Sequence, residues 1–148
     1  MKRIVLTALA LAVSFSLVSC AGEQKKTEPS KPDLLEEGWV SDDEFRVKTF
    51  GETELASKDQ DALRKSSEAA AVKKARETVV KNFVATRMKQ SPGAGTYAVI
   101  ALSIDKDFRD IIEGGKVIRK SFDNGDRKCS IVYSVEKNGL KKMVEQKK

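Results

Sequence analysis

Residues 116–136 read KVIRKSFDNGDRKCSIVYSVE, and this stretch predicts the architecture of the domain. The Asn-Gly dipeptide at 124–125 is the one that best tolerates the positive φ angles of a tight hairpin turn. The flanking residues 116–122 and 127–136 are rich in β-branched and aromatic side chains, which favour strands. Alternate positions of the second strand predict one buried face, made of Cys129, Ile131, Tyr133 and Val135. An isolated hairpin is marginally stable, so other elements must cover that face.

A long helix upstream is the first candidate cover. Residues 58–90 contain no Gly or Pro, Ser57 is the expected N-cap, and the breakers at 91–95 end the helix. Spacings of three and four put apolar residues on one face, made of Val72, Ala75, Val79 and Phe83. The small side chains of Ala69–Ala71 would let another element approach the helix backbone closely. We expect Phe83 to be buried.

A second helix is expected within residues 96–113, and the following Gly114-Gly115 ends it. Helical spacing is kept by Tyr97, Ile100, Ala101, Ile104, Phe108, Ile111 and Ile112. Residues 97–102 also fit a strand, so both assignments stay open there. We expect Ile111 to be buried together with Phe83.

Two shorter elements complete the predicted fold. Over residues 44–51, Phe45, Val47 and Thr49 alternate with Arg46, Lys48 and Phe50, and this period of two predicts a strand. After the hairpin, a short last helix is expected to be anchored by Leu140, Met143 and Val144. The predicted fold is therefore α+β, with a small antiparallel sheet packed against a long alanine-rich helix and a second helix. All of it belongs to a single domain, residues 34–148.

The N-terminus differs in composition from the rest of the chain. A short positive start precedes an uncharged apolar run from Ile4 to Val18. That run is about fifteen residues long, which suits a secretory signal better than a membrane-spanning helix of about twenty. It ends in LVSC at 17–20, a lipobox pattern that resembles the sites processed by lipoprotein signal peptidase. The resemblance implies removal of residues 1–19 and attachment of diacylglycerol to Cys20, which would hold the protein firmly to a membrane. The alternative is a plain secretory signal with an incidental Cys, but the position of Cys20 directly at the end of the apolar run, before a polar segment, favours lipidation.

The lipidated Cys and a flexible tether are expected to occupy residues 20–33. Residues 21–33 read AGEQKKTEPSKPD and contain no large apolar side chain that could join a core. Extended, this segment could hold the domain several tens of ångströms from the bilayer, at up to about 3.3 Å per residue. Ala21 follows the Cys where Asp would favour the inner membrane in the enterobacterial sorting scheme. By that analogy we expect the outer membrane.

Composition excludes several classes of function. The chain has no His, which removes Ser-His-Asp and Cys-His nucleophiles and the commonest transition-metal ligand. The signal carries two of the 28 basic residues and none of the 22 acidic ones, so its removal lowers the net charge from +6 to +4. The lysines are interspersed with acidic residues, whereas a nucleic-acid site would cluster them on one face. We expect neither a nucleic-acid partner nor a cofactor.

After acylation of Cys20, Cys129 would be the remaining thiol, so no internal disulfide is possible. Its place in the alternating pattern predicts a buried strand residue. The alternatives are an intermolecular disulfide or a reactive thiol.

Two acidic groups could in principle bind a metal. Close together in the second helix are Asp105, Asp107, Asp110 and Glu113. Lys106 and Arg109 lie among these acids, which is typical of a solvated helix face rather than a calcium loop. The turn at Asp123–Asp126 lacks the third ligand and the later Glu of an EF-hand, so we interpret it as a hairpin turn. We predict no metal site.

Two further motifs are interpreted structurally. The glycine-rich stretch at 91–96 lacks the Lys of a phosphate-binding loop, so it is expected to connect two helices. Trp39 is flanked by the acids Glu36, Glu37, Asp42 and Asp43. These could form an acid pair beside an aromatic sugar platform, but an acidic loop with one anchoring Trp is the commoner arrangement.

These features together resemble the Lpp-twenty lipoprotein family, small outer-membrane-associated antigens of Gram-negative bacteria. The resemblance covers about 39–146. It is carried by SEAAAVKKAR at 67–76, KDF at 106–108, IIEGGKVI at 111–118 and CSIVYSV at 129–135. The domain is also similar to one in a flagellar ring protein. The resemblance implies an α+β domain, membrane attachment and non-enzymatic work in an envelope assembly, and it carries over no functional residues.

We therefore predict a non-enzymatic, membrane-anchored envelope lipoprotein that binds another protein or itself. The alternatives are a module that binds a small apolar molecule or cell-wall glycan, and an enzyme that uses carboxylates. An exposed apolar patch or sheet edge would favour protein binding. A pocket ringed by polar groups would favour a ligand, and a buried carboxylate pair with shifted pKa values would favour an enzyme.

Overall fold

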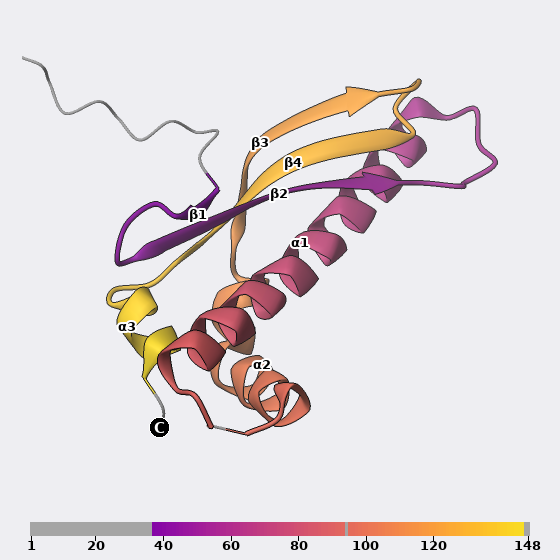
Figure 1. The fold of residues 1–148 in the computed structure, drawn as a ribbon. Helices are drawn as coiled ribbons and strands as arrows, with labels where there is room; N and C mark the ends of the chain where they lie inside the picture. The colour runs from indigo at the N-terminus through magenta and orange to yellow at the C-terminus, as the bar shows by residue number, and fades with distance from the viewer. Residues whose placement is uncertain (1–36, 94, 147–148) are drawn as a thin grey trace, which may run out of the picture. The chain divides into compact units, whose positions relative to one another are not determined.

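The computed structural model describes residues 37–93 and 95–146 (Figure 1). The predicted signal peptide, Cys20, the tether and the start of the domain at 34–36 lie outside these residues. The described elements are β1 (Gly38–Trp39), β2 (Glu44–Glu52), α1 (Gln60–Gln90), α2 (Tyr97–Glu113), β3 (Lys116–Asp123), β4 (Lys128–Glu136) and α3 (Leu140–Glu145). The predicted α+β fold is confirmed.

The four strands of this part of the chain form one antiparallel sheet in the order β1-β2-β4-β3. The central strands β2 and β4 pair along their whole lengths, from Glu44 opposite Glu136 to Glu52 opposite Lys128. The predicted β3–β4 hairpin is confirmed. Its turn places Asn124, Gly125 and Asp126 at positive φ, where Asn, Gly and Asp cost least.

The helices lie on one side of the sheet, with α1 running across β2 and β4 (Figure 1). The buried positions of α1 recur mostly every four residues, and they are Leu63, Ser67, Ala71, Ala75, Val79, Phe83, Val84 and Arg87. Small residues in the middle of this stripe let β2 come very close. A Cβ placed on Gly51 would lie 2.1 Å from the backbone nitrogen of Ala71. The expected close approach at the alanine run is therefore confirmed.

Aromatic rings fill the core between β1, β2, α1 and α2. Phe83 has no exposed surface and lies edge-on to Phe45 and Phe108, with ring centroids 5.3 and 5.7 Å apart. Trp39 stacks on Phe83 at a centroid distance of 5.6 Å. The buried face predicted for β4 is also confirmed, because Cys129, Ile131, Tyr133 and Val135 all belong to this core. The Phe83 ring of α1 therefore contacts rings from β1, β2 and α2.

The segment 97–102, for which a strand or helix stayed open, is helical and begins α2. The predicted burial of Ile111 is wrong in degree, because this residue only packs against the edge of the core while Ile112 is inside it. Helical geometry explains the difference. Ile100, Ile104, Phe108 and Ile112 recur every four residues on the face toward α1, and Ile111 lies to one side of that line.

Three smaller predictions need correction. The N-cap of α1 is Asp59 and not Ser57, because the Asp59 carboxylate accepts the Asp61 backbone N–H at 3.0 Å. Val72 is half-buried, and Ala71 takes its place in the core, since the α1 stripe follows a four-residue spacing. In α3, Leu140 and Val144 are buried as predicted, whereas Met143 is 38% exposed.

Arg87 joins the three helices from a buried position that the sequence did not predict. Its guanidinium donates to the carbonyls of Met143 and Val144 in the last turn of α3, at 3.3 and 3.0 Å. It also donates to the Ser103 hydroxyl of α2 at 3.2 Å. A cation beside the C-terminal carbonyls of a helix is favourable because they carry partial negative charge. The buried guanidinium of Arg87 thus has hydrogen-bond acceptors and at the same time caps the C-terminus of α3.

Candidate interaction surfaces

The acids of α2 do not converge on a metal site. Asp105 pairs with Arg109 along the helix surface, and this hydrogen bond raises the pKa of Arg109. Asp107 is exposed, as predicted for a solvated face, and its carboxylate lies 3.9 Å from the Arg87 guanidinium and accepts from the Ser103 hydroxyl. Asp110 and Glu113 are exposed. Among the described residues, no group of three or more Asp, Glu or Cys side chains could hold a metal ion.

The acidic loop before β2 has a structural role. The Asp43 carboxylate accepts the Gly139 backbone N–H at 2.6 Å. The backbone carbonyls of Asp42 and Asp43 accept the backbone N–H groups of Lys141 and Lys137, respectively. These bonds hold the turn between β4 and α3. Trp39 packs on the core, so the interpretation as an anchoring Trp is confirmed. Glu36 lies outside the described residues.

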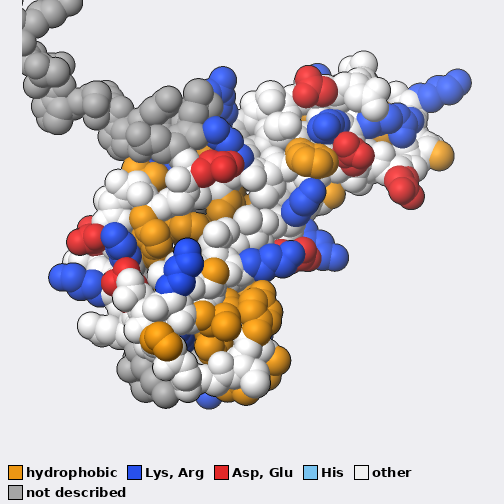
Figure 2. Space-filling model, in the orientation of Figure 1, with side chains coloured by type: hydrophobic (Ala, Val, Ile, Leu, Met, Phe, Trp, Pro, Cys, Tyr) orange, Lys and Arg blue, Asp and Glu red, His pale blue; other side chains and the backbone are white. Residues whose placement is uncertain are grey.

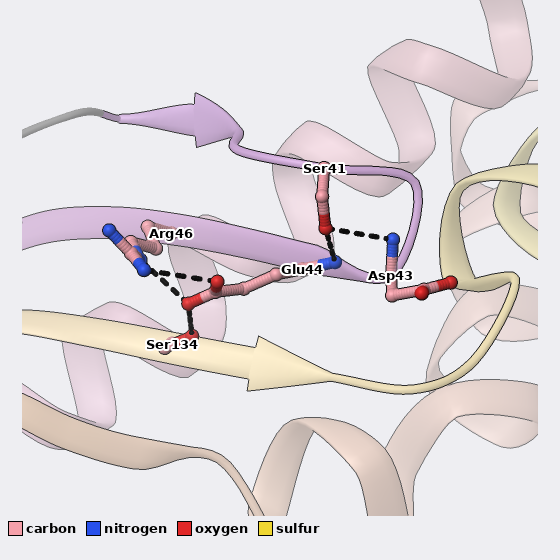
Figure 3. A network of polar contacts seen from close by, with 5 residues as sticks. All are labelled: Ser41, Asp43, Glu44, Arg46 and Ser134. Atoms are coloured by element: carbon pink, nitrogen blue, oxygen red, sulfur yellow. Dashed lines mark hydrogen bonds and ion pairs between the residues drawn. The ribbon is translucent and has the colours of Figure 1, made fainter. Parts of the chain in front are cut away.

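Figure 3 shows a charged network beside this loop. The Glu44 carboxylate accepts from Arg46 Nε at 2.6 Å and Nη2 at 3.0 Å, and also from the Ser134 hydroxyl at 2.6 Å. The hydrogen bonds from Arg46 lower the pKa of Glu44, against the opposing effect of partial burial. A general acid needs the opposite shift. This network ties β2 to β4 and gives no support to carboxylate catalysis.

Cys129 is fully buried on the inner face of β4, as its place in the alternating pattern predicted. Burial raises the pKa of its thiol, and the nearby carboxylate of Glu68 raises it further. A protonated thiol without solvent access is a poor nucleophile. The structure therefore favours the core interpretation over a reactive thiol or an intermolecular disulfide.

A surface of exposed apolar side chains covers the beginning of α2. We call it the apolar end and define it by Tyr97, Val99 and Leu102, which are 50, 58 and 72% exposed. Figure 2 shows hydrophobic side chains gathered over this part of the molecule. Residues 97–102 are apolar around the whole helix, but one side alone faces α1. Helices that are apolar all round are normally buried, so the outward side lacks a cover in the described chain.

The outer face of the sheet, opposite the helices, carries a second feature. A hollow of about 340 Å³ opens across β2, β4 and β3. Its lining consists of Lys48, Thr49, Phe50, Arg119, Ser121, Ser130, Ile131 and Val132. The sequence did not predict this hollow, because its side chains come from three strands that only the sheet brings together. Phe50 lies on this outer face and is 44% exposed.

Comparison of the chain with protein-family models, curated proteins and solved structures found no match. The Lpp-twenty resemblance therefore stays a prediction. Within the described residues, no helix combines the length and apolar character needed to cross a bilayer.

Proposed function

We propose that this protein is a membrane-anchored bacterial envelope lipoprotein whose domain binds another protein without catalysing a reaction. The apolar end carries this proposal. Val99 and Leu102 are three residues apart and lie next to each other on the outward side of α2. Exposed apolar patches often mark sites of protein association. The lipobox at 17–20 and the polar segment 21–33 support the anchor and its tether. Anchored copies would be concentrated at one surface, where weak contacts suffice.

The alternatives receive less support. An enzyme that uses carboxylates would need an acid with a raised pKa, whereas the Glu44 pKa is lowered by Arg46. A glycan-binding module would need a free aromatic face on which a sugar could stack. The exposed Phe50 ring already has the ammonium groups of Lys74 and Lys128 over it, 3.9 and 4.5 Å from its centroid. The hollow beside Phe50 remains the feature that favours a ligand.

The anchor is tested at Cys20. The variant Cys20→Ser should not be acylated, because diacylglycerol is attached through the thiol. We expect the variant to move from the membrane to the soluble fraction when cells are broken and washed at high salt. Wild-type protein should be recovered with the outer membrane. A Cys129→Ser variant is the matched control and should stay with the membrane. A Cys20→Ser protein that still pelleted with membranes would contradict the lipid anchor.

The apolar end is tested by the double variant Val99→Gln and Leu102→Gln. Both side chains are exposed, so the fold should persist, while capture of envelope proteins by crosslinking in intact cells should fall at least about tenfold. Full burial of a Val or Leu side chain contributes about 1.5–3 kcal/mol, and a Gln replacement would lose most of that contribution. Leu55→Gln is the matched control, because Leu55 is 44% exposed and lies in the loop before α1, whereas the apolar end follows the C-terminus of α1. It should not change capture.

Two results would count against this interface. Undiminished crosslinking by the double variant would show that the apolar end is not the binding surface. Flotation of the Cys20→Ser protein with neutral lipid vesicles, lost in the double variant, would assign this surface to the bilayer instead.

A further inference from the structure

The hollow on the outer sheet face has a simple layout that follows from strand register. Lys48, Val132 and Arg119 lie side by side in one row across β2, β4 and β3. Phe50, Ser130 and Ser121 form the next row. Directly paired residues of an antiparallel sheet point to the same face. The hollow therefore has a cation on each side, Val132 as an apolar floor between them, and two hydroxyls beside it.

The charged side chains that line this hollow are all positive. No carboxylate is among its lining residues. The neighbouring basic residues Arg46, Lys120 and Lys128 form ion pairs with Glu44, Glu68 and Glu52. The Lys48 ammonium and the Arg119 guanidinium form no ion pair within the described ranges, and both residues are exposed. One carboxylate lies near Lys48, that of Glu37, and it accepts the Lys48 backbone N–H at 3.0 Å. The two cations are available to an anionic partner.

We propose that this hollow binds an extended acidic segment of a partner protein, in which two carboxylates flank an apolar side chain. Adjacent strands are about 4.8 Å apart, so Lys48 and Arg119 are about 10 Å apart at their Cα atoms. In an extended peptide, residues i and i+4 point to one side and are about 13 Å apart. The long Lys and Arg side chains accommodate that small difference. The residue at i+2 then lies over Val132.

Other anions fit the site less well. The lining offers Ser121 and Ser130 hydroxyls, which can hydrogen-bond a peptide main chain. Its volume of about 340 Å³ is at the lower end of ligand pockets and holds a few side chains. A flat bilayer surface would not enter a hollow. The site is separate from the apolar end, and the inference does not rest on the proposed function.

The test uses the mature lipidated protein in a zwitterionic detergent and a fluorescent blocked heptapeptide. The peptide has Glu at its second and sixth positions, Leu at the fourth, and Thr elsewhere. Fluorescence anisotropy should show binding that weakens as salt screens the charges. A peptide with Gln in place of both Glu residues should bind at least about tenfold more weakly, since charge pairing is lost at two points.

Variants of the protein locate the binding. The double change Lys48→Glu and Arg119→Glu should weaken peptide binding at least about tenfold. The matched control is Lys106→Glu with Lys142→Glu, which alters the net charge equally at exposed sites on α2 and α3. It should change binding less than about twofold. Ser121→Leu should also weaken binding, because it fills the hollow without changing charge. Thermal melting should show each variant folded.

Three outcomes would overturn the proposal. Equal binding of the Glu and Gln peptides would show that the carboxylates are not recognised. Equal losses in the two double variants would show general attraction of charge rather than a site. Binding to anionic phosphatidylglycerol vesicles that depends on Lys48 and Arg119, without peptide binding, would assign the surface to lipid.

Discussion

Replacing Phe83 with Ala should lower the free energy of unfolding by about 3–5 kcal/mol, the usual cost of removing a large aromatic side chain from a core. Phe83 is fully buried and contacts the rings of Trp39, Phe45 and Phe108. These rings come from β1, β2 and α2, so the cavity would loosen the packing of three elements on α1. Such a loss is a large part of the roughly 5–15 kcal/mol that stabilises a typical domain.

Urea unfolding followed by circular dichroism measures this loss. Phe50→Ala is the matched control, because Phe50 is 44% exposed on the outer sheet face. Its cost should be well below that of Phe83→Ala, since less apolar surface returns to water. A cost below about 1 kcal/mol for Phe83→Ala would contradict the packing described for α1.

The second large effect is expected at Gly51. In Gly51→Ala the new Cβ would lie 2.1 Å from the Ala71 nitrogen and 2.6 Å from the Ser67 carbonyl oxygen. Both atoms belong to the α1 backbone, so no side chain can turn away and the strand must separate from the helix. We expect a cost of about 3 kcal/mol or more, at the upper end of overpacking effects.

A double variant distinguishes backbone contact from side-chain crowding. Adding Ala71→Gly to Gly51→Ala should not restore stability, because the contact is with backbone atoms. Glu52→Ala is the control on the same strand and should cost little, since Glu52 is exposed. Urea unfolding again provides the measurement. Recovery of stability in the double variant would show that the methyl group of Ala71 was the obstacle.

The two surfaces proposed to bind partners were harder to predict than the fold. The apolar run at 97–102 suggests a fully buried segment. The sequence does not show that α1 covers only one side of it. The hollow depends on Lys48 and Arg119, which are distant in the chain and become neighbours through their register with Val132. The burial of Arg87 could not be predicted from the sequence either, because it depends on the α3 carbonyls that accept its hydrogen bonds.

Local patterns in the sequence predicted every described element, in the right order, except β1, whose two residues are recognisable as a strand only through their pairing with β2. The Asn-Gly turn at 124–125, the alternation in β4 and the unbroken helix before the breakers at 91–95 all act through local backbone preferences. Tertiary structure alone decided how deeply each face is buried. Ala71 and Ile112 lie in the core in place of Val72 and Ile111, because the angle at which helices and sheet meet selects the four-residue line that faces inward.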